Sequence, residues 1–73
     1  MDEYKLLHDF GRNLKDLLDD SFMSQKELAE ETGISEPTIS RYIAGEGMPT
    51  LKNIVSIMIA LDCEFNELID MWL

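Results

Sequence analysis

The 73-residue chain has little of what most functional classes need. Its single cysteine, Cys63, has no second cysteine in the chain with which to form a disulfide or a thiolate metal cluster. No apolar stretch approaches the roughly 20 residues that cross a bilayer. The acidic start Met-Asp-Glu-Tyr also lacks the apolar run of a signal peptide. We therefore expect a cytoplasmic protein with no metal, no other cofactor and no membrane partner.

Catalytic motifs are also missing. The chain contains no G-x-S-x-G, P-loop, H-E-x-x-H or C-x-x-C pattern. Its one histidine, His8, precedes Asp9 on an expected helix, where sequence neighbours point apart and cannot form an acid–base pair. The adjacent acids Asp19-Asp20 and Glu30-Glu31 are explained by a solvated face. These absences predict no catalytic residue, no small-molecule substrate and no enzyme.

The chain has few prolines and glycines, and nearly all of them lie at positions where a helix can begin or end. The two prolines and three of the four glycines fall at the ends of segments whose apolar residues recur at helical spacing, or between these segments. Gly11 is the exception, and we expect it to allow close backbone approach by another helix. The chain is 45% apolar, which is enough for one small core. This composition favours an all-α fold with a single domain over residues 1–73.

Five helices are expected from this spacing, at 3–18, 25–32, 36–44, 51–61 and from residue 64 onward. Phe22 and Met23 should bring apolar side chains under the second helix. The expected inward-facing set is Tyr4, Leu7, Leu14, Leu17, Leu18, Leu28, Ile34, Ile39, Tyr42, Leu51, Ile54, Val55, Met58, Leu61, Phe65, Leu68, Ile69 and Trp72.

The segment from Ser24 to Tyr42 is the most specific part of the chain. Ser24 and Glu27 have the spacing of a capping box, which closes the start of the second helix. Gly33 can adopt the positive φ of a helix end. Ser35 can cap the third helix, and Pro37 falls in its first turn, where its missing N–H is harmless. Two short helices around such a turn form a helix-turn-helix, whose second helix enters the DNA major groove.

The same segment closely resembles the lambda-repressor-like (Xre/Cro type) helix-turn-helix family. The matching runs are Ser24-Gln25, Glu27-Leu28-Ala29, Gly33-Ile34-Ser35 and Thr38-Ile39-Ser40-Arg41, and the likeness extends from about Gly11 to Ile69. The resemblance implies a compact five-helix DNA-binding domain with its helix-turn-helix core at about 24–44. It also implies a transcriptional regulator, which we expect to be a repressor.

Candidate base contacts lie on the third helix. With Ile39 taken as inward, the outward arc holds Pro37, Thr38, Ser40 and Arg41, with Glu36 at the helix tip. The resemblance implies base reading by the first, second and sixth residues of this helix, here Glu36, Pro37 and Arg41. Two alternatives stay open, because Arg41 could pair with a surface acid and Glu36 could simply favour the helix dipole.

Candidate phosphate contacts are Gln25, by its match to the family's glutamine, together with Ser24, Lys26 and Lys52. The chain departs from the family after the third helix, where relatives usually carry Lys or Arg. Here the loop reads Glu46-Gly47-Met48, and Leu18 stands where many relatives have arginine. With a net charge of −9 as well, we expect weak DNA binding by a monomer, because phosphate neutralisation dominates affinity.

A homodimer would double the phosphate contacts. Its expected interface is the apolar set Met58, Ile59, Met71, Trp72 and Leu73, although Trp72 could instead fold onto its own core. A second hypothesis is an acidic protein-interaction module on the same fold, such as an antitoxin or a regulator-binding protein. The missing loop bases and the net charge motivate this alternative, with a toxin or another regulator as the partner.

Overall fold

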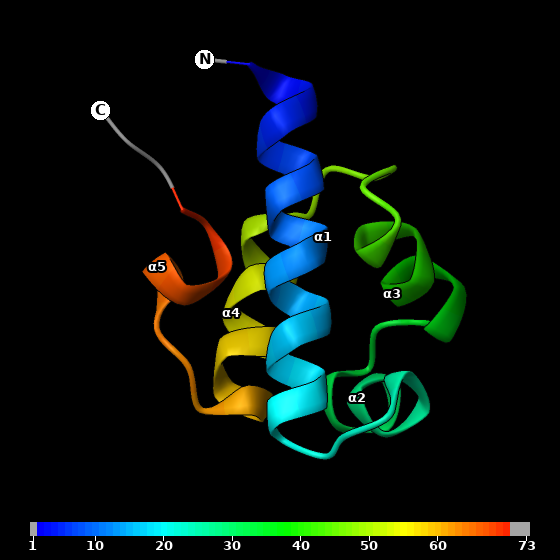
Figure 1. Ribbon diagram of the computed structural model, residues 1–73. Helices are drawn as coiled ribbons and strands as arrows, with labels where there is room; N and C mark the ends of the chain where they lie inside the picture. Colours follow the sequence, from blue (N-terminus) through cyan, green and yellow to red (C-terminus); the bar gives the residue numbers. More distant parts are fainter. Residues whose placement is uncertain (1, 71–73) are drawn as a thin grey trace.

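The computed structural model describes residues 2–70, which form five helices. These are α1 (Glu3–Asp20), α2 (Gln25–Thr32), α3 (Glu36–Ile43), α4 (Leu51–Leu61) and α5 (Phe65–Leu68). α1 is the central element, with α2 and α3 on one side and α5 on the other (Figure 1). The all-α, five-helix architecture expected from the sequence is confirmed. α1 runs two residues further than expected, and Ala44 is the C-cap of α3.

The helix boundaries follow the capping residues of the sequence. Ser24 Oγ accepts from the Glu27 N–H at 3.0 Å, and a Glu27 carboxylate oxygen accepts from the Ser24 N–H at 3.2 Å. Gly33 ends α2 with a left-handed φ of 77°. Ser35 and Thr50 cap α3 and α4 through their hydroxyl oxygens. The turn between α2 and α3 is therefore closed by local hydrogen bonds and by one glycine.

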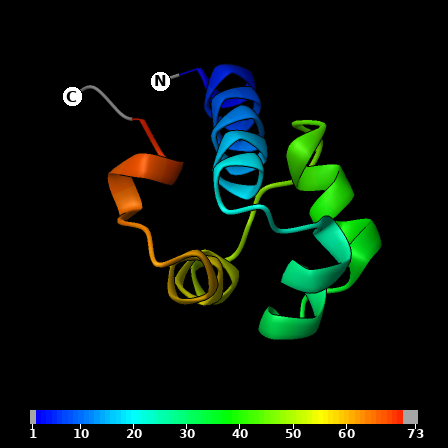
Figure 2. The ribbon, with the colours of Figure 1, turned by 60° about the horizontal axis from the view of Figure 1, so that its bottom comes forward.

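The five helices surround a common interior (Figure 2), and the core fills this interior. The largest fully buried side chains come from all five helices and are Phe10, Leu14, Leu28, Ile39, Ile57 and Leu68. Phe10 packs edge-on against Tyr42, with ring centroids 5.6 Å apart. As expected, Leu28, Ile34, Ile39 and Tyr42 are all buried, so the helix-turn-helix is held by its own apolar faces.

Gly11 brings α1 and α3 into backbone contact. A Cβ at this position would clash with the Tyr42 carbonyl oxygen and would lie 2.6 Å from the Ile43 carbonyl oxygen. Any side chain here would therefore push the end of α3 away from α1. The expectation that Gly11 allows a close helix approach is confirmed.

Two side-chain amides connect α5 to α1 and α4 to α3 through hydrogen bonds. Asn13 Nδ2 donates to the Leu68 carbonyl at 2.9 Å and thereby ties α1 to the last turn of α5. Asn53 Nδ2 donates to the Tyr42 hydroxyl at 2.9 Å and thereby ties α4 to α3. Among the described residues, no helix is long and apolar enough to cross a membrane.

Several residues expected to face inward are exposed instead. Tyr4, Phe22, Leu51, Val55 and Phe65 all lie on the surface. In α4 the core side is formed by the isoleucines and the leucine at 54, 57 and 61. α4 is apolar at nearly every position, so its sequence does not fix which side is buried. The expected core residue at position 72 lies outside the described residues.

Candidate nucleic-acid interface

α3 presents one exposed side away from the core. Its buried side carries Ile39 and Tyr42. The opposite side carries the exposed residues Glu36, Pro37, Ser40, Arg41 and Ala44, spaced so that they share a single face. Ala44 was not expected among the site residues, but it lies four residues after Ser40 on that face. Its methyl group extends the exposed face by one turn beyond Ser40.

Arg41 is the cation of this face. It is exposed, and among residues 2–70 it makes no ion pair within 4.0 Å. A Cβ on Gly47 would lie 3.8 Å from Arg41 Nη2, so the guanidinium lies beside the loop that follows α3. The alternative in which a surface acid neutralises Arg41 therefore does not describe this structure. All five guanidinium N–H donors can be directed to a partner.

Gln25 connects the start of α2 to the exposed face of α3. Ser40 Oγ donates to Gln25 Oε1 at 2.7 Å. This bond occupies the amide oxygen and leaves the two N–H donors of Nε2 for an external acceptor. The two residues were expected to contact different parts of DNA, and the structure places them in direct contact.

The hydroxyl groups at the start of α2 and α3 have structural roles as well. Ser35 Oγ donates to Thr38 Oγ1 at 2.8 Å and accepts from the Thr38 N–H at 3.3 Å. Thr38 is half-buried, so less of it is accessible than of Ser40. The Ser24 hydroxyl oxygen caps α2, and the hydroxyl proton remains free to donate.

The bases of α1 are neutralised on their own helix. Lys5 Nζ lies 2.7 Å from Asp9, Arg12 Nη2 lies 3.3 Å from the same carboxylate, and Lys15 Nζ lies 2.7 Å from Asp19. The hydrogen bond from Lys5 is the main cause of a lowered Asp9 pKa, and the positive charges nearby act in the same direction. These three bases therefore offer little net positive charge to DNA.

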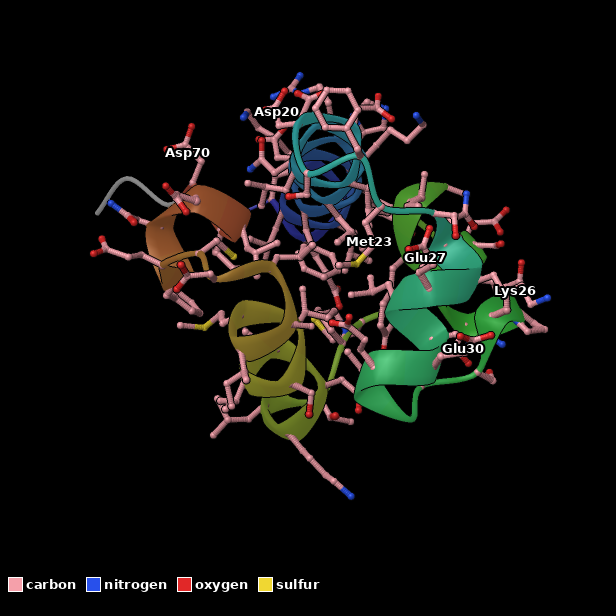
Figure 3. All side chains as sticks on the ribbon, turned by 90° about the horizontal axis from the view of Figure 1, so that it is seen from below. Asp20, Met23, Lys26, Glu27, Glu30 and Asp70 are labelled. Atoms are coloured by element: carbon pink, nitrogen blue, oxygen red, sulfur yellow. The ribbon has the colours of Figure 1, made fainter. Side chains whose placement is uncertain are left out.

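The other three bases are distributed differently. Lys26, Arg41 and Lys52 come from α2, α3 and α4, are exposed, and make no ion pair within 4.0 Å among the described residues. Lys26 points outward from α2 (Figure 3). The chain thus keeps one unpaired cation on each of the three helices expected to contact DNA, despite its net charge of −9.

The apolar residues expected to form a dimer interface occupy different environments. Ile59 is exposed, whereas Met58 packs against the protein's own core. Positions 71, 72 and 73, which were expected to contribute Met71, Trp72 and Leu73, lie outside the described residues. Sequence reasoning did not place Leu51 and Val55 on this surface, because it assigned both to the core.

Within residues 2–70, no group of three or more His, Cys, Asp and Glu side chains is placed to hold a metal. Cys63 is half-buried, and this burial, with smaller contributions from Glu67 and Asp62, raises the pKa of its thiol. The raised pKa favours the protonated thiol over the reactive thiolate at neutral pH.

Comparison with known proteins agrees with this geometry. The helix-turn-helix family model HTH_3 matches residues 14–68. The transcriptional repressor RstR of the cryptic phage CTXphi from Vibrio cholerae is 41% identical over 49 residues, which are 67% of this chain and 44% of RstR. The chain thus spans less than half the length of that relative.

Two solved structures share the fold. The restriction-modification controller protein C.AhdI from Aeromonas hydrophila superposes with a TM-score of 0.81 at 32% identity, over 85% of this chain and 94% of C.AhdI. An HTH_3 transcriptional regulator from Vibrio cholerae superposes with a TM-score of 0.85 over 92% of this chain and 38% of its own length. At 22% identity, this second likeness concerns the fold alone. The chain therefore belongs to the HTH_3 family of Xre/Cro, lambda-repressor-like helix-turn-helix proteins, which are DNA-binding transcriptional regulators and not enzymes.

Proposed function

We propose that this protein is a sequence-specific repressor that binds double-stranded DNA in the cytoplasm as a homodimer. Residues 1–73 act as a single domain, and residues 36–44 enter the major groove. The observation that carries the proposal is the exposed face of α3, where Arg41 has no ion pair among residues 2–70 and Ser40 donates a hydrogen bond to Gln25. The RstR repressor among its relatives supports the repressor assignment.

Base reading is assigned to the exposed face of α3. Arg41 donates two hydrogen bonds to guanine O6 and N7, and Glu36 accepts from cytosine N4. Pro37 offers apolar contact to a thymine methyl group. Ser40 gives its proton to Gln25 and keeps lone pairs for a base donor. Thr38, which is half-buried, completes the set at the edge of this face.

Phosphate binding is assigned to a small number of groups. Gln25 Nε2 and the Ser24 hydroxyl donate at the start of α2, while Lys26 and Lys52 contribute charge. Each neutralised phosphate contributes a slope of about −0.9 to the dependence of log K on log salt. With so few contacts, a monomer holds DNA weakly, and two copies on adjacent half-sites hold it far better.

The dimer interface is proposed on α4. Leu51, Val55 and Ile59 are spaced four residues apart and form a stripe on one side of the helix, with exposed fractions of 74%, 45% and 77%. Ile59 also lines a pocket of about 460 Å³ beside the end of α2. This apolar stripe fits a second copy of the chain, because α4 is a long acid-free segment in a chain of net charge −9. Met58 is left out because it packs inward.

Selection of DNA from a random pool at low salt tests the proposal. We expect enrichment of a sequence with two-fold symmetry and half-sites about 34–36 Å apart. Arg41→Ala should lower affinity by about 1–3 kcal/mol and relax specificity at one base pair. A promoter carrying the selected site should be silenced when the protein is produced. No enrichment, or an Arg41→Ala protein that selects the same sequence with equal affinity, would refute the proposal.

A further inference from the structure

The loop that connects α3 to α4 turns back onto the end of α3 (Figure 1). The Gly45 N–H donates to the Tyr42 carbonyl at 3.0 Å. The Glu46 N–H donates to the Arg41 carbonyl at 2.9 Å. These two bonds form a Schellman motif, with Gly45 in the left-handed conformation. The loop is therefore anchored at the residue that carries the guanidinium of the exposed face of α3.

Gly47, in the same loop, lies close to both Tyr42 and Arg41. A Cβ on Gly47 would lie 3.6 Å from two atoms of the Tyr42 ring and 3.8 Å from Arg41 Nη2. Arg41 and Tyr42 follow one another in α3, so their side chains leave the helix about 100° apart, and only Tyr42 is buried. Through Gly47, the loop therefore joins the buried side of α3 to its exposed side.

The Tyr42 ring is itself fixed by contacts with two other helices. It is 4% exposed and packs edge-on against Phe10 of α1. Its hydroxyl accepts from Asn53 Nδ2 of α4 at 2.9 Å, and among residues 2–70 this is the one hydrogen bond between α3 and α4. The Asn53 backbone N–H donates separately to Thr50 Oγ1 at 3.1 Å, within the first turn of α4. The ring is therefore tied to the capped start of α4.

We propose that Tyr42 and Asn53 are positioning residues for base recognition by Arg41. The bond between the Asn53 amide and the Tyr42 hydroxyl holds the ring, the ring supports Gly47, and Gly47 limits the orientations of the guanidinium. An arginine side chain loses rotamer freedom when it makes a bidentate contact, so restriction before binding favours one base over the others. This inference rests on the proposed function, in which Arg41 reads a guanine. It gives neither Tyr42 nor Asn53 a contact with DNA.

The composition of the loop favours a positioning role over a phosphate contact. Residues 45–48 read Gly-Glu-Gly-Met and include no lysine or arginine, so the loop has no positive charge to offer DNA. Its one charged side chain, Glu46, repels phosphate. Loss of the positioning contacts should therefore change base discrimination and leave the salt dependence of DNA binding unaltered.

Base discrimination on the selected operator tests the proposal. The base pair of interest is the one at which Arg41→Ala relaxes specificity. The measured ratio is the dissociation constant for an operator with that pair changed, divided by the constant for the unchanged operator. Tyr42→Phe and Asn53→Ala should each lower this ratio by about threefold to tenfold. The double variant should lower it no further, because both changes break the same bond. The slope of log K against log salt should stay the same.

Asn13→Ala is the matched control for a merely structural effect. It removes a side-chain amide hydrogen bond of the same length, 2.9 Å, which joins α1 to α5 instead of α4 to α3. Its thermal midpoint should fall by about as much as that of Asn53→Ala, while its base discrimination stays at the wild-type level. A second measurement needs no DNA. NMR relaxation of the Arg41 Nε–H group in the free protein should show greater mobility in Tyr42→Phe than in the wild type.

Three results would overturn the proposal. The first is wild-type discrimination in Tyr42→Phe and Asn53→Ala when Arg41→Ala has lost it. The second is an equal loss of discrimination in Asn13→Ala, and the third is unchanged mobility of the Arg41 side chain. An Arg41→Ala protein that discriminates as well as the wild type would instead refute the proposed function, and this inference with it. The two failures are therefore distinguishable.

Discussion

Ser40 Oγ and Gln25 Oε1 are 2.7 Å apart, and their hydrogen bond joins the exposed face of α3 to the first residue of α2. A group proposed to contact a base thereby orients a group proposed to contact a phosphate. The bond fixes the Gln25 amide so that its N–H donors, not its oxygen, are available to an anion. The proposed base contact and the proposed phosphate contact are therefore coupled through one hydrogen bond.

This coupling predicts non-additive substitutions. Ser40→Ala and Gln25→Ala should each weaken operator binding by about 1 kcal/mol, the usual net worth of a hydrogen bond. The double variant should lose clearly less than the sum, because each single change already breaks the shared bond. Fluorescence anisotropy with the selected operator at fixed salt measures the cycle. Strictly additive losses would show that the two residues act independently on DNA.

The distribution of ion pairs predicts which bases contribute to DNA binding. Lys26→Ala and Lys52→Ala should each reduce the slope of log K against log salt by about 0.9. Arg12→Ala and Lys15→Ala are the matched controls, because their charges are already paired on α1. Titrations at several salt concentrations give the slopes. A larger change for the α1 variants than for Lys26 and Lys52 would contradict this assignment.

The contact at Gly11 predicts a large loss of stability. Gly11→Ala places a methyl group against the Tyr42 and Ile43 carbonyl oxygens, and backbone atoms cannot rotate away. We expect the free energy of unfolding to fall by about 3 kcal/mol, the upper part of the range for overpacking. Asp16→Ala, at an exposed position on the same helix, should change it by less than about 0.5 kcal/mol. Urea denaturation followed by circular dichroism measures both, and an unaffected Gly11→Ala would rule out the tight approach of α3.

The apolar stripe on α4 predicts the site of self-association. Ile59→Glu should raise the dimer dissociation constant by at least about tenfold, because a charge would be buried against a second apolar stripe. Tyr4→Glu changes an equally exposed residue away from α4 and should have no effect. Sedimentation velocity over a range of concentrations reports both. A wild-type protein that stays monomeric at high micromolar concentration would exclude the dimer.

The raised pKa of Cys63 predicts slow alkylation. Burial disfavours the charged thiolate, and the Glu67 and Asp62 carboxylates add to the effect. At neutral pH iodoacetamide should therefore react several-fold more slowly with the folded chain than with the same chain in urea. The difference should shrink as the pH rises through the raised pKa and the folded thiol ionises. Equal rates at neutral pH would mean that the thiol is not shielded.

The sequence was most informative where structure is decided locally. Caps, the glycine turn and the helix-turn-helix core depend on residues a few positions apart, and the structure confirmed Ser24, Glu27, Gly33 and Ser35 in these roles. Gly11 was also interpreted correctly, because a glycine inside a helix calls for a steric reason. All five helices were found, since each boundary has its own signal.

The incorrect predictions concerned which side of a helix is buried, and the sequence did not reveal the contacts between different helices. α4 offers many apolar residues, so periodicity alone could not show that Ile57 is buried and that Leu51 and Val55 are exposed. Phe22 was expected to pack inward, because its apolar character gave no hint of the left-handed turn that directs it to solvent. The Ser40–Gln25 bond spans fifteen positions and depends on how α2 and α3 cross, which is a property of the assembled core.

The close approach of α1 to α3 at Gly11 fixes the position of α3 without involving the exposed side chains of that helix. The contact is made between Gly11 and the backbone carbonyl oxygens of Tyr42 and Ile43 at the end of α3. None of the exposed residues Glu36, Pro37, Ser40 and Arg41 takes part in that contact. A new operator could therefore be acquired by exchanging those four side chains one at a time, without repacking the core. The packing that fixes the position of α3 is therefore independent of the side chains proposed to contact DNA.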